Sequence, residues 1–307
     1  MDKPIIFCGI DGANPLGFLA AVGAAQVINS CCSSIRLSWC VDKGAWRPSL
    51  WGFNGDGSEL LQNLHRALSE ASPYPFEIDK KLPFSAIAFS AALRDMAKEA
   101  TPAKRRVADI LAGFGSEIHF DDKDVFLDTS FRMVRSGDSA GQGLPAYALS
   151  IRNSLNVEAL SRTLFQFWEY DDREFSLRWD PLEDQRYALR WHDPSSPSNK
   201  KSGPRTMRGA NSLALEALAL FPVQPQRSGI ITTGFSQRGR RKEFFSWPIW
   251  EVPISLDVIR SLLAYPELQK EKPSRATLVK RGIVEVYRCE RTAPNKYYKN
   301  FTPSWSA

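Results

Sequence analysis

The side chains of this chain that could bind a charged ligand are concentrated in short basic runs. One run is Lys104-Arg105-Arg106. Two further runs carry Ser, Gly or Thr among the charges, which is typical of loop tips. Cationic loop tips can follow a phosphate backbone through contacts that are independent of base sequence and that weaken with salt. We therefore predict a nucleic-acid-binding site made of Lys200, Lys201, Arg205, Arg208, Arg238, Arg240, Arg241 and Lys242.

The first of these two runs stands directly before a segment with helical periodicity, "GANSLALEALAL" at 209–220. Asn211 is predicted to cap this helix, and the free N–H groups of a first helical turn favour anions. The sequence therefore predicts that loops 199–208 and 238–242 meet beside the helix start and bind phosphate there. Another Gly-Ala-Asn opens a similar apolar stretch at residues 12–14.

Aromatic residues close to the last basic run could stack on bases, namely Phe235, Phe244 and Phe245. Aromatic side chains in a strand such as "FSWPIW" are more often part of a core. Both interpretations stay open at this point.

Enzymatic chemistry has few candidate residues, because the chain has only three histidines, His65, His119 and His192. The sequence places His119 close to Asp121, Asp122 and Asp124, but this spacing matches no metal-ligand signature, and a solvated acidic turn explains it as well. We expect no metal there.

His192 follows three carboxylates, Asp180, Glu183 and Asp184. Such a group could perform acid/base chemistry on a phosphodiester, which is the alternative function. Asp180 and Asp193 each precede a proline, however, as turn residues commonly do.

Sequence motifs for nucleotide hydrolysis, dinucleotide binding and serine hydrolysis are missing, so we expect no cofactor and no enzymatic activity. The five cysteines have no C-x-x-C spacing, which gives no support to a zinc site or a disulfide framework. A reducing, cytoplasmic location is expected. No apolar run is long enough to span a membrane, and the N-terminal segment is predicted as a strand followed by a helix.

Strand-like and helix-like segments are interspersed along the whole chain. Asn14 and Pro15 are typical of a helix start, and the periodicity predicts helices over 58–71 and 156–170. Ser58 and Asn156 are the expected caps of these two helices. This mixture predicts an α+β fold with mainly antiparallel sheets packed against several amphipathic helices.

The Gly113-Phe114-Gly115 stop suggests a boundary between an N-terminal α/β subdomain, 1–115, and a C-terminal α+β subdomain, 116–307. One continuous domain is the alternative. "SLRWDP" and "ALRWHDP" repeat one theme, and each is predicted as a strand that ends in an Asp-Pro turn.

The blocks "NPLGFLAAVGA", "RWDPLEDQRYALRWHDPS", "RGANSLALEALALFPVQP" and "FSWPIWEVP" together resemble proteins of the CRISPR type I-G systems, formerly type I-U. The similarity is to the family related to the helicase-nuclease extension and to the effector large subunit. It covers most of the chain and is weakest over 50–170.

The resemblance implies a role in RNA-guided antiviral defence. The expected partners are other subunits of a CRISPR effector complex, with guide RNA or target DNA, and no membrane. In such complexes base pairing reads the sequence while protein subunits hold backbones. No catalytic residue is carried over, so the expected function is a non-catalytic nucleic-acid-binding or assembly subunit. A protein–protein adaptor that docks through Trp46 and Trp51 is a further alternative.

Overall fold

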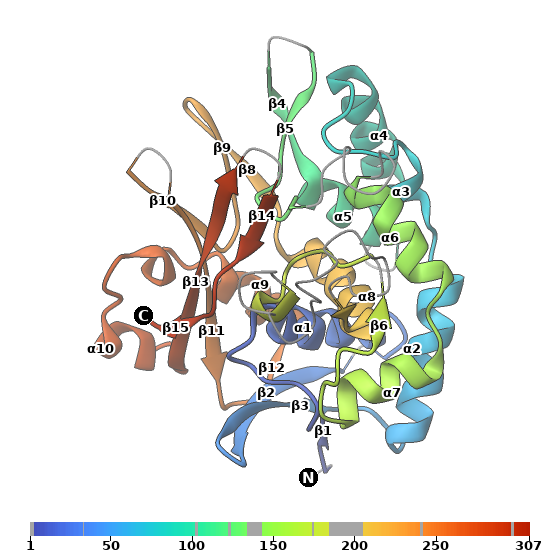
Figure 1. Ribbon diagram of the computed structural model, residues 1–307, viewed down its shortest axis with the longest axis vertical. Helices are drawn as coiled ribbons and strands as arrows, with labels where there is room; N and C mark the ends of the chain where they lie inside the picture. The colour runs from blue at the N-terminus through green and yellow to red at the C-terminus, as the bar shows by residue number, and fades with distance from the viewer. Residues whose placement is uncertain are drawn as a thin grey trace, which may run out of the picture.

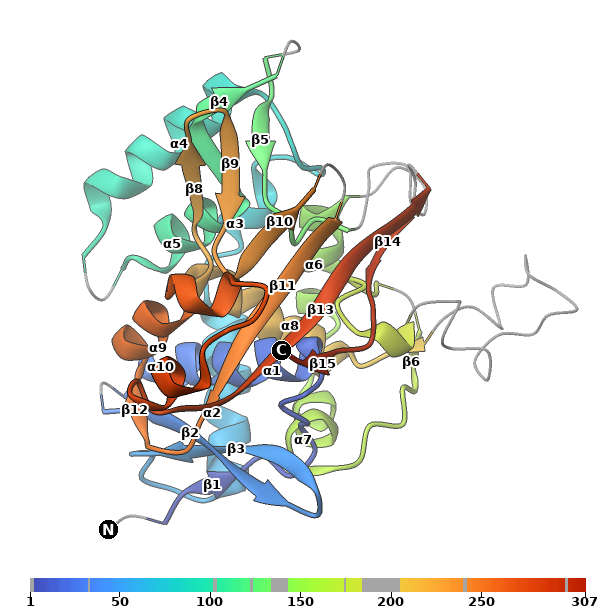
Figure 2. The ribbon, with the colours of Figure 1, turned by 90° about the vertical axis from the view of Figure 1, so that its left-hand side faces the viewer.

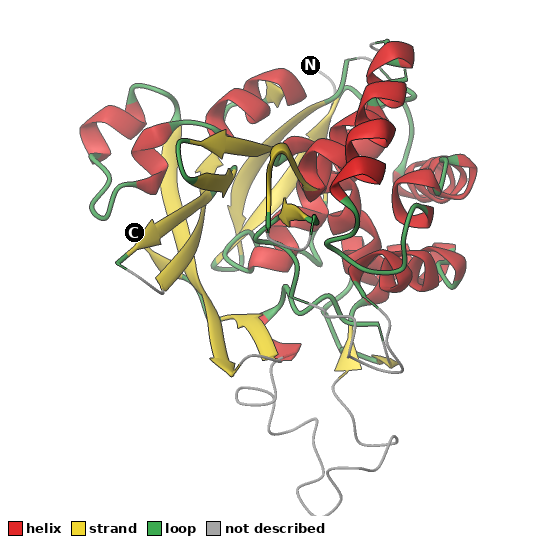
Figure 3. Cartoon of the chain, turned by 90° about the horizontal axis from the view of Figure 1, so that it is seen from above, coloured by secondary structure: helices red, strands yellow, loops and turns green. Residues whose placement is uncertain are grey.

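The computed structural model describes residues 3–32, 34–101, 104–121, 124–133, 143–173, 175–183, 205–239, 242–295 and 298–307. The fold is α+β, as predicted, and every pair of described strands is antiparallel. Most helices gather on one side of the molecule and most strands on the other (Figure 3).

The helices are α1 (Pro15–Asn29), α2 (Gly57–Glu70), α3 (Tyr74–Glu77), α4 (Ala86–Glu99), α5 (Arg106–Phe114), α6 (Leu144–Asn153), α7 (Val157–Phe165), α8 (Arg208–Ala217), α9 (Leu256–Leu263) and α10 (Arg275–Val279), with short 3-10 turns η1 (Pro181–Glu183), η3 (Leu218–Leu220) and η4 (Pro266–Gln269). None of the helices in the described part of the chain combines the length and the apolar character needed to cross a membrane.

The strands are β1 (Ile5–Ile6), β2 (Arg36–Asp42), β3 (Ala45–Trp51), β4 (Gly115–Phe120), β5 (Phe126–Asp128), β6 (Asp172–Arg173), β7 (Arg205–Thr206), β8 (Val223–Gln226), β9 (Gly229–Thr232), β10 (Phe235–Arg238), β11 (Lys242–Trp250), β12 (Ile254–Ser255), β13 (Ile283–Asn295), β14 (Tyr298–Phe301) and β15 (Trp305–Ser306). The larger sheets have the orders β1-β3-β2-β12 and β10-β11-β13-β14, with β15 also pairing with β13.

Helix α1 lies at the centre, between the β10–β14 sheet and the outer helices (Figure 1). It is buried on almost all sides, which agrees with its nearly uniform apolar sequence. Its main helical neighbour is α8, the second Gly-Ala-Asn helix. A Cβ atom at Gly23 would lie only 1.9 Å from the carbonyl oxygen of Leu213, so this glycine allows the two backbones to touch.

Tryptophans of β11 connect the C-terminal half of the chain to the N-terminal half. The indole N–H of Trp247 donates to the carbonyl oxygen of Gly12 at 2.8 Å, and that of Trp250 donates to Leu37 at 2.7 Å. Strand β12 completes the N-terminal sheet by pairing with β2. Both sides of residue 115 therefore contribute to one continuous core.

Several local predictions can be compared directly with the fold. Asn14 caps α1 by accepting a hydrogen bond from the Gly17 N–H at 3.1 Å, as predicted, and Asn156 caps α7 in the same way. The predicted cap at Ser58 is wrong, because Asp56, two residues earlier, caps α2 in a capping box with Glu59.

The first copy of the repeated Leu-Arg-Trp-Asp-Pro motif forms no strand. Residues 175–179 are irregular, and Phe175 and Arg178 have positive φ angles of 56° and 63°. Such angles are incompatible with an extended strand. The second copy lies outside the described residues.

Candidate functional site

The predicted phosphate site at the start of α8 is occupied by a carboxylate of the protein itself. Asp172 Oδ2 accepts the N–H of Arg208, the first residue of α8, at 2.8 Å. The guanidinium of Arg205 lies 3.7 Å from Asp171, and Arg162 lies 3.3 Å from Asp172. The helix start, Arg162 and Arg205 are therefore neutralised internally, by the same chemistry that would bind a phosphate. The Arg208 guanidinium donates to the Ser154 carbonyl oxygen at 3.4 Å.

Asn211 does not cap α8, which corrects the sequence prediction. The helix begins three residues earlier, and the Asn211 N–H donates to the Met207 carbonyl inside it. The buried amide of Asn211 instead donates to Thr206 Oγ1 at 2.8 Å and accepts the Leu177 N–H at 3.1 Å. This asparagine holds the irregular 175–183 segment against α8.

The two Gly-Ala-Asn asparagines reach a common pair of buried carboxylates. Asn14 donates to Asp180 Oδ2 at 3.0 Å, and the Asn211 amide lies 3.5 Å from Glu183 Oε1. The Tyr170 hydroxyl also donates to Asp180, at 2.8 Å. The two copies of the Gly-Ala-Asn motif therefore contribute to one polar network in the core.

Burial raises the pKa of both carboxyl groups in this network. The charge of Asp180 adds to the effect at Glu183, whose pKa rises from its ordinary value of 4.5 to about 8. Asp180 accepts hydrogen bonds from Asn14, Tyr170 and the Leu182 N–H, which favour its charged form. Ser176 and Thr206 contact Glu183 through hydroxyls, which can also accept a hydrogen bond from a protonated carboxyl. Glu183 is therefore the better site for the proton that the two carboxyl groups share.

Asp180 and Glu183 are therefore unsuited to the acid/base role that the alternative function gives them. Both are at most 1% exposed, and both are fully engaged by neighbouring groups. His192 and Asp184, the other members of that group, lie outside the described residues. The arrangement ties the 175–183 segment to the starts of α1 and α8, which is a structural role.

The basic run at 104–106 is also largely neutralised. Arg105 pairs with Asp109 at 2.8 Å. Arg106 forms a two-pronged pair with the buried Glu216 of α8, with both N–O distances at 2.6 Å, and Arg152 reaches the same carboxylate at 3.3 Å. This run stabilises the fold.

In the run at 238–242, the described arginine has no carboxylate partner among the described residues. The Arg238 guanidinium lies over the ring of Phe244, 4.7 Å from its centroid, and donates to the carbonyl oxygen of Lys270 at 3.3 Å. Lys242 is exposed and lies opposite Arg238 in the β10–β11 pair. Within the described residues, no acidic side chain forms an ion pair with either of these two cations.

The described ends of the two basic loops lie on different parts of the molecule. The end of β10, with Arg238, and strand β6, which pairs with the strand of Arg205, lie far apart in both Figure 1 and Figure 2. Lys200, Lys201, Arg240 and Arg241 lie outside the described residues. The candidate interface is therefore reduced to the β10–β11 hairpin.

The three phenylalanines predicted near the hairpin are buried, in agreement with the core interpretation. Phe235 is 2% exposed, Phe245 is fully buried, and Phe244 is 7% exposed. Two residues that sequence reasoning missed lie beside Phe244 on the sheet: Arg288 of β13 and Trp305 of β15. The alternating pattern of the β13 sequence could have predicted which face of the sheet Arg288 lies on. Nothing in the sequence predicts that β15 joins this sheet.

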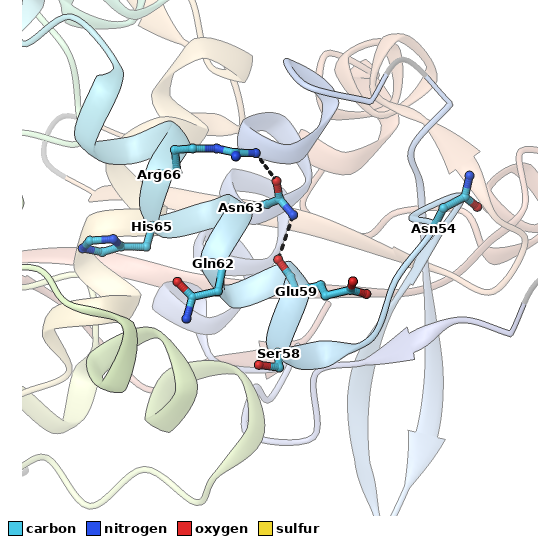
Figure 4. A pocket seen from close by; sticks show the side chains of 7 residues that line it. All are labelled: Asn54, Ser58, Glu59, Gln62, Asn63, His65 and Arg66. Atoms are coloured by element: carbon cyan, nitrogen blue, oxygen red, sulfur yellow. Dashed lines mark hydrogen bonds between the residues drawn. The ribbon is translucent and has the colours of Figure 1, made fainter.

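Other polar groups are scattered. A shallow pocket of about 380 Å³ is lined by Asn54 and by polar side chains of α2. Figure 4 shows that His65 points away from Glu59 and Arg66, so these groups do not converge. The His119 Nε2 contacts the Gln226 carbonyl oxygen at 2.7 Å, and the described residues contain no group of three or more side chains suited to hold a metal ion.

The tryptophans of the adaptor hypothesis are only partly exposed. Trp46 packs against the core, and the indole N–H of Trp51 donates to Ser38 Oγ at 3.0 Å. Neither side chain projects freely from the β2–β3 hairpin.

No model of a known protein family matches the chain, and a comparison with curated proteins also finds no match.

Proposed function

We propose that this protein is a non-catalytic nucleic-acid-binding or assembly subunit of a CRISPR type I effector complex, acting in antiviral defence in the cytoplasm. Its partners are the other subunits of that complex, with guide RNA or target DNA. The connection to CRISPR systems is supported by the sequence resemblance. The nucleic-acid contact is supported by the geometry of the β10–β11 hairpin.

The single observation that carries the proposal is the uncompensated charge of Arg238. Most other arginines of the predicted basic runs contact carboxylates, whereas Arg238 contacts an aromatic ring and a carbonyl oxygen. Lys242 adds a second free charge beside it. The sequence adds Arg240 and Arg241 between them. A concentrated positive charge of this kind favours phosphate.

The non-catalytic part of the proposal is supported by the buried network. Asp180 and Glu183, two carboxylates of the alternative function, hold the protein core together and are not accessible to a phosphodiester. Strand cleavage in the complex is assigned to another subunit.

A charge-reversal experiment tests the nucleic-acid contact. The double variant Arg238→Glu/Lys242→Glu is compared with Lys98→Glu, which reverses one charge on α4, where Lys98 is 75% exposed. Binding of a fluorescein-labelled 30-mer to purified protein is measured by anisotropy at low salt. The hairpin variant should lose at least 10-fold in affinity, whereas the control should bind like the wild type.

The assembly role is tested by co-expressing the chain with the other effector genes and a guide RNA. Affinity purification of the wild-type chain should retain both the partner subunits and the guide RNA. Retention of neither partner nor nucleic acid, together with equal oligonucleotide binding by both variants, contradicts the proposal.

A further inference from the structure

One face of the β10–β14 sheet combines an exposed aromatic ring with the cations of the hairpin, and its interpretation rests on the proposed function. Residues that lie opposite one another in neighbouring strands point to the same side of a sheet. The strand registers therefore place one set of side chains on the face turned away from α1, which we call the outer face: Ser236, Arg238, Lys242, Phe244, Ser246, Arg288, Glu290 and Trp305.

Trp305 is the exposed aromatic residue of this outer face. Its side chain is 41% exposed, whereas Phe244 beside it is 7% exposed. The two rings meet edge to face, with centroids 6.1 Å apart and an interplanar angle of 87°. Phe244 therefore supports the Trp305 ring and leaves part of it open to solvent.

Cations surround this aromatic pair. Arg238 lies over the same Phe244 ring that Trp305 contacts, at 4.7 Å. Arg288 lies directly opposite Trp305 in the β13–β15 pair, and its guanidinium is fixed by Ser246 Oγ at 2.8 Å and by the carbonyl oxygens of Leu268 and Lys270. The Arg288 side chain is only 1% exposed, so it supports the sheet from within, and Arg238 is the cation of the two that a ligand can reach.

The balance of charge on the outer face is positive. Burial, together with the nearby Arg238 charge, lowers the pKa of Arg288 to about 10, while Glu271 opposes this shift. Glu290 lies opposite Phe244 and is the acidic member of the set above. A phosphate beside Arg238 would offset the repulsion between its charge and that of the buried Arg288.

The lower part of the outer face is covered. Leu268 and Leu278, from η4 and α10, pack on Ile283 and Val286 of β13. In Figure 2, α10 lies beside the lower end of the sheet, and the tip of β10 stays clear of it. Phe244, Ser246 and Arg288 are at most 7% exposed, so the open part of this face consists of the Trp305 ring together with Arg238 and Lys242.

We infer that this open part of the outer face binds single-stranded nucleic acid, with Trp305 stacking on a base and with Arg238 and Lys242 contacting the flanking phosphates. Base–aromatic stacking needs an unpaired base, because the bases of a duplex are already stacked inside it. The arrangement therefore predicts a preference for single strands over duplexes, with little dependence on sequence.

The test compares Trp305→Ala, Trp305→Phe and a control, Phe167→Ala, in the full-length protein. Phe167 is an exposed aromatic residue, 88% exposed, in the segment between α7 and β6. Binding to a labelled dT20 strand and to a 20-bp duplex is measured for each variant at one salt concentration. Circular dichroism and the melting temperature identify any variant that does not fold.

We expect Trp305→Ala to weaken dT20 binding by about 10-fold, which corresponds to the usual strength of one stacked base. Trp305→Phe should retain most of the affinity, Phe167→Ala should have no effect, and duplex binding should change little in all variants. If Trp305→Ala does not fold, crosslinking of a 5-bromouracil strand to the wild type, followed by peptide mapping, takes its place and should label the peptide that contains Trp305.

Three results overturn the inference: Trp305→Ala binds dT20 like the wild type, Trp305→Ala loses single-strand and duplex binding equally, or the crosslink maps to another surface. If the Arg238→Glu/Lys242→Glu variant still loses binding in that case, the proposed function stands and only the stacking role fails. Absence of any binding by the wild type overturns both.

Discussion

Asn14 and Asp180 are joined by a 3.0 Å hydrogen bond across 166 residues of sequence, and the same asparagine caps α1. One short side chain therefore starts the central helix and satisfies a buried carboxylate. Asn211 has the corresponding position in the second Gly-Ala-Asn motif, but it acts from inside its helix.

Replacement of Asn14 by Ala should cost more than the loss of an ordinary helix cap. The cap contributes about 1 kcal/mol, and the lost donor to buried Asp180 adds about 1–3 kcal/mol. Asn156→Ala is the matched control, because Asn156 caps α7 by accepting the Ala159 N–H. Urea denaturation should show a larger loss for Asn14→Ala, and equal losses would indicate that the Asp180 contact contributes nothing.

Glu183→Gln should change how stability depends on pH. The pKa of Glu183 is raised to about 8 in the folded protein, from an ordinary value of 4.5. The folded state therefore keeps a proton that the unfolded chain releases, and the unfolding free energy of the wild type falls as the pH rises from about 4.5 to about 8. Glutamine cannot titrate, so the variant should lack this part of the decline.

The measurement is the unfolding free energy of wild type, Glu183→Gln and Glu99→Gln at several pH values between 5 and 8. Glu99 is an exposed carboxylate at the end of α4 and serves as the control. The wild type and Glu99→Gln should decline in parallel, with Glu183→Gln flatter than both. An identical slope for all three proteins would contradict a protonated, buried Glu183.

Glu216→Gln should strongly destabilise the fold. The Glu216 carboxylate is 2% exposed and neutralises Arg106 and Arg152, so its loss leaves two partly buried guanidinium groups without a counter-charge. Breaking a buried ion pair from one side typically costs about 3–5 kcal/mol. Asp95→Asn, which breaks an exposed pair with Lys98, should cost less than about 1 kcal/mol by the same chemical-denaturation measurement.

A similar loss for Glu216→Gln and Asp95→Asn would show that the Glu216 cluster is not a main support of α8. Arg152→Met offers a second check, because it removes a cation that burial already disfavours. Its cost should be smaller than that of Glu216→Gln, since Arg106 still pairs with the carboxylate.

Local sequence signals predicted the elements that depend on neighbouring residues. Asn14 followed by Pro15 predicted the start of α1, and the helical periodicity over 58–71 and 156–170 predicted α2 and α7.

The sequence-based predictions were wrong where a residue interacts with another that is distant in the sequence. The second Gly-Ala-Asn lies within α8, because the Asp172 carboxylate allows the helix to start at Arg208. The neutralisation of Arg106 by Glu216 joins residues 110 positions apart. A basic run therefore looks the same in the sequence whether its charges are free or paired, and only the fold distinguishes Arg238 from Arg106.

The most direct test of the central claim is the salt dependence of nucleic-acid binding by the wild type and by Arg238→Gln/Lys242→Gln. If both side chains contact phosphate, the slope of log K against log salt should become shallower by about 2 units in the variant, because each contact releases about one counterion. Lys98→Gln should leave the slope unchanged. A variant with the wild-type slope and affinity would contradict the assignment of the β10–β11 hairpin as the nucleic-acid interface.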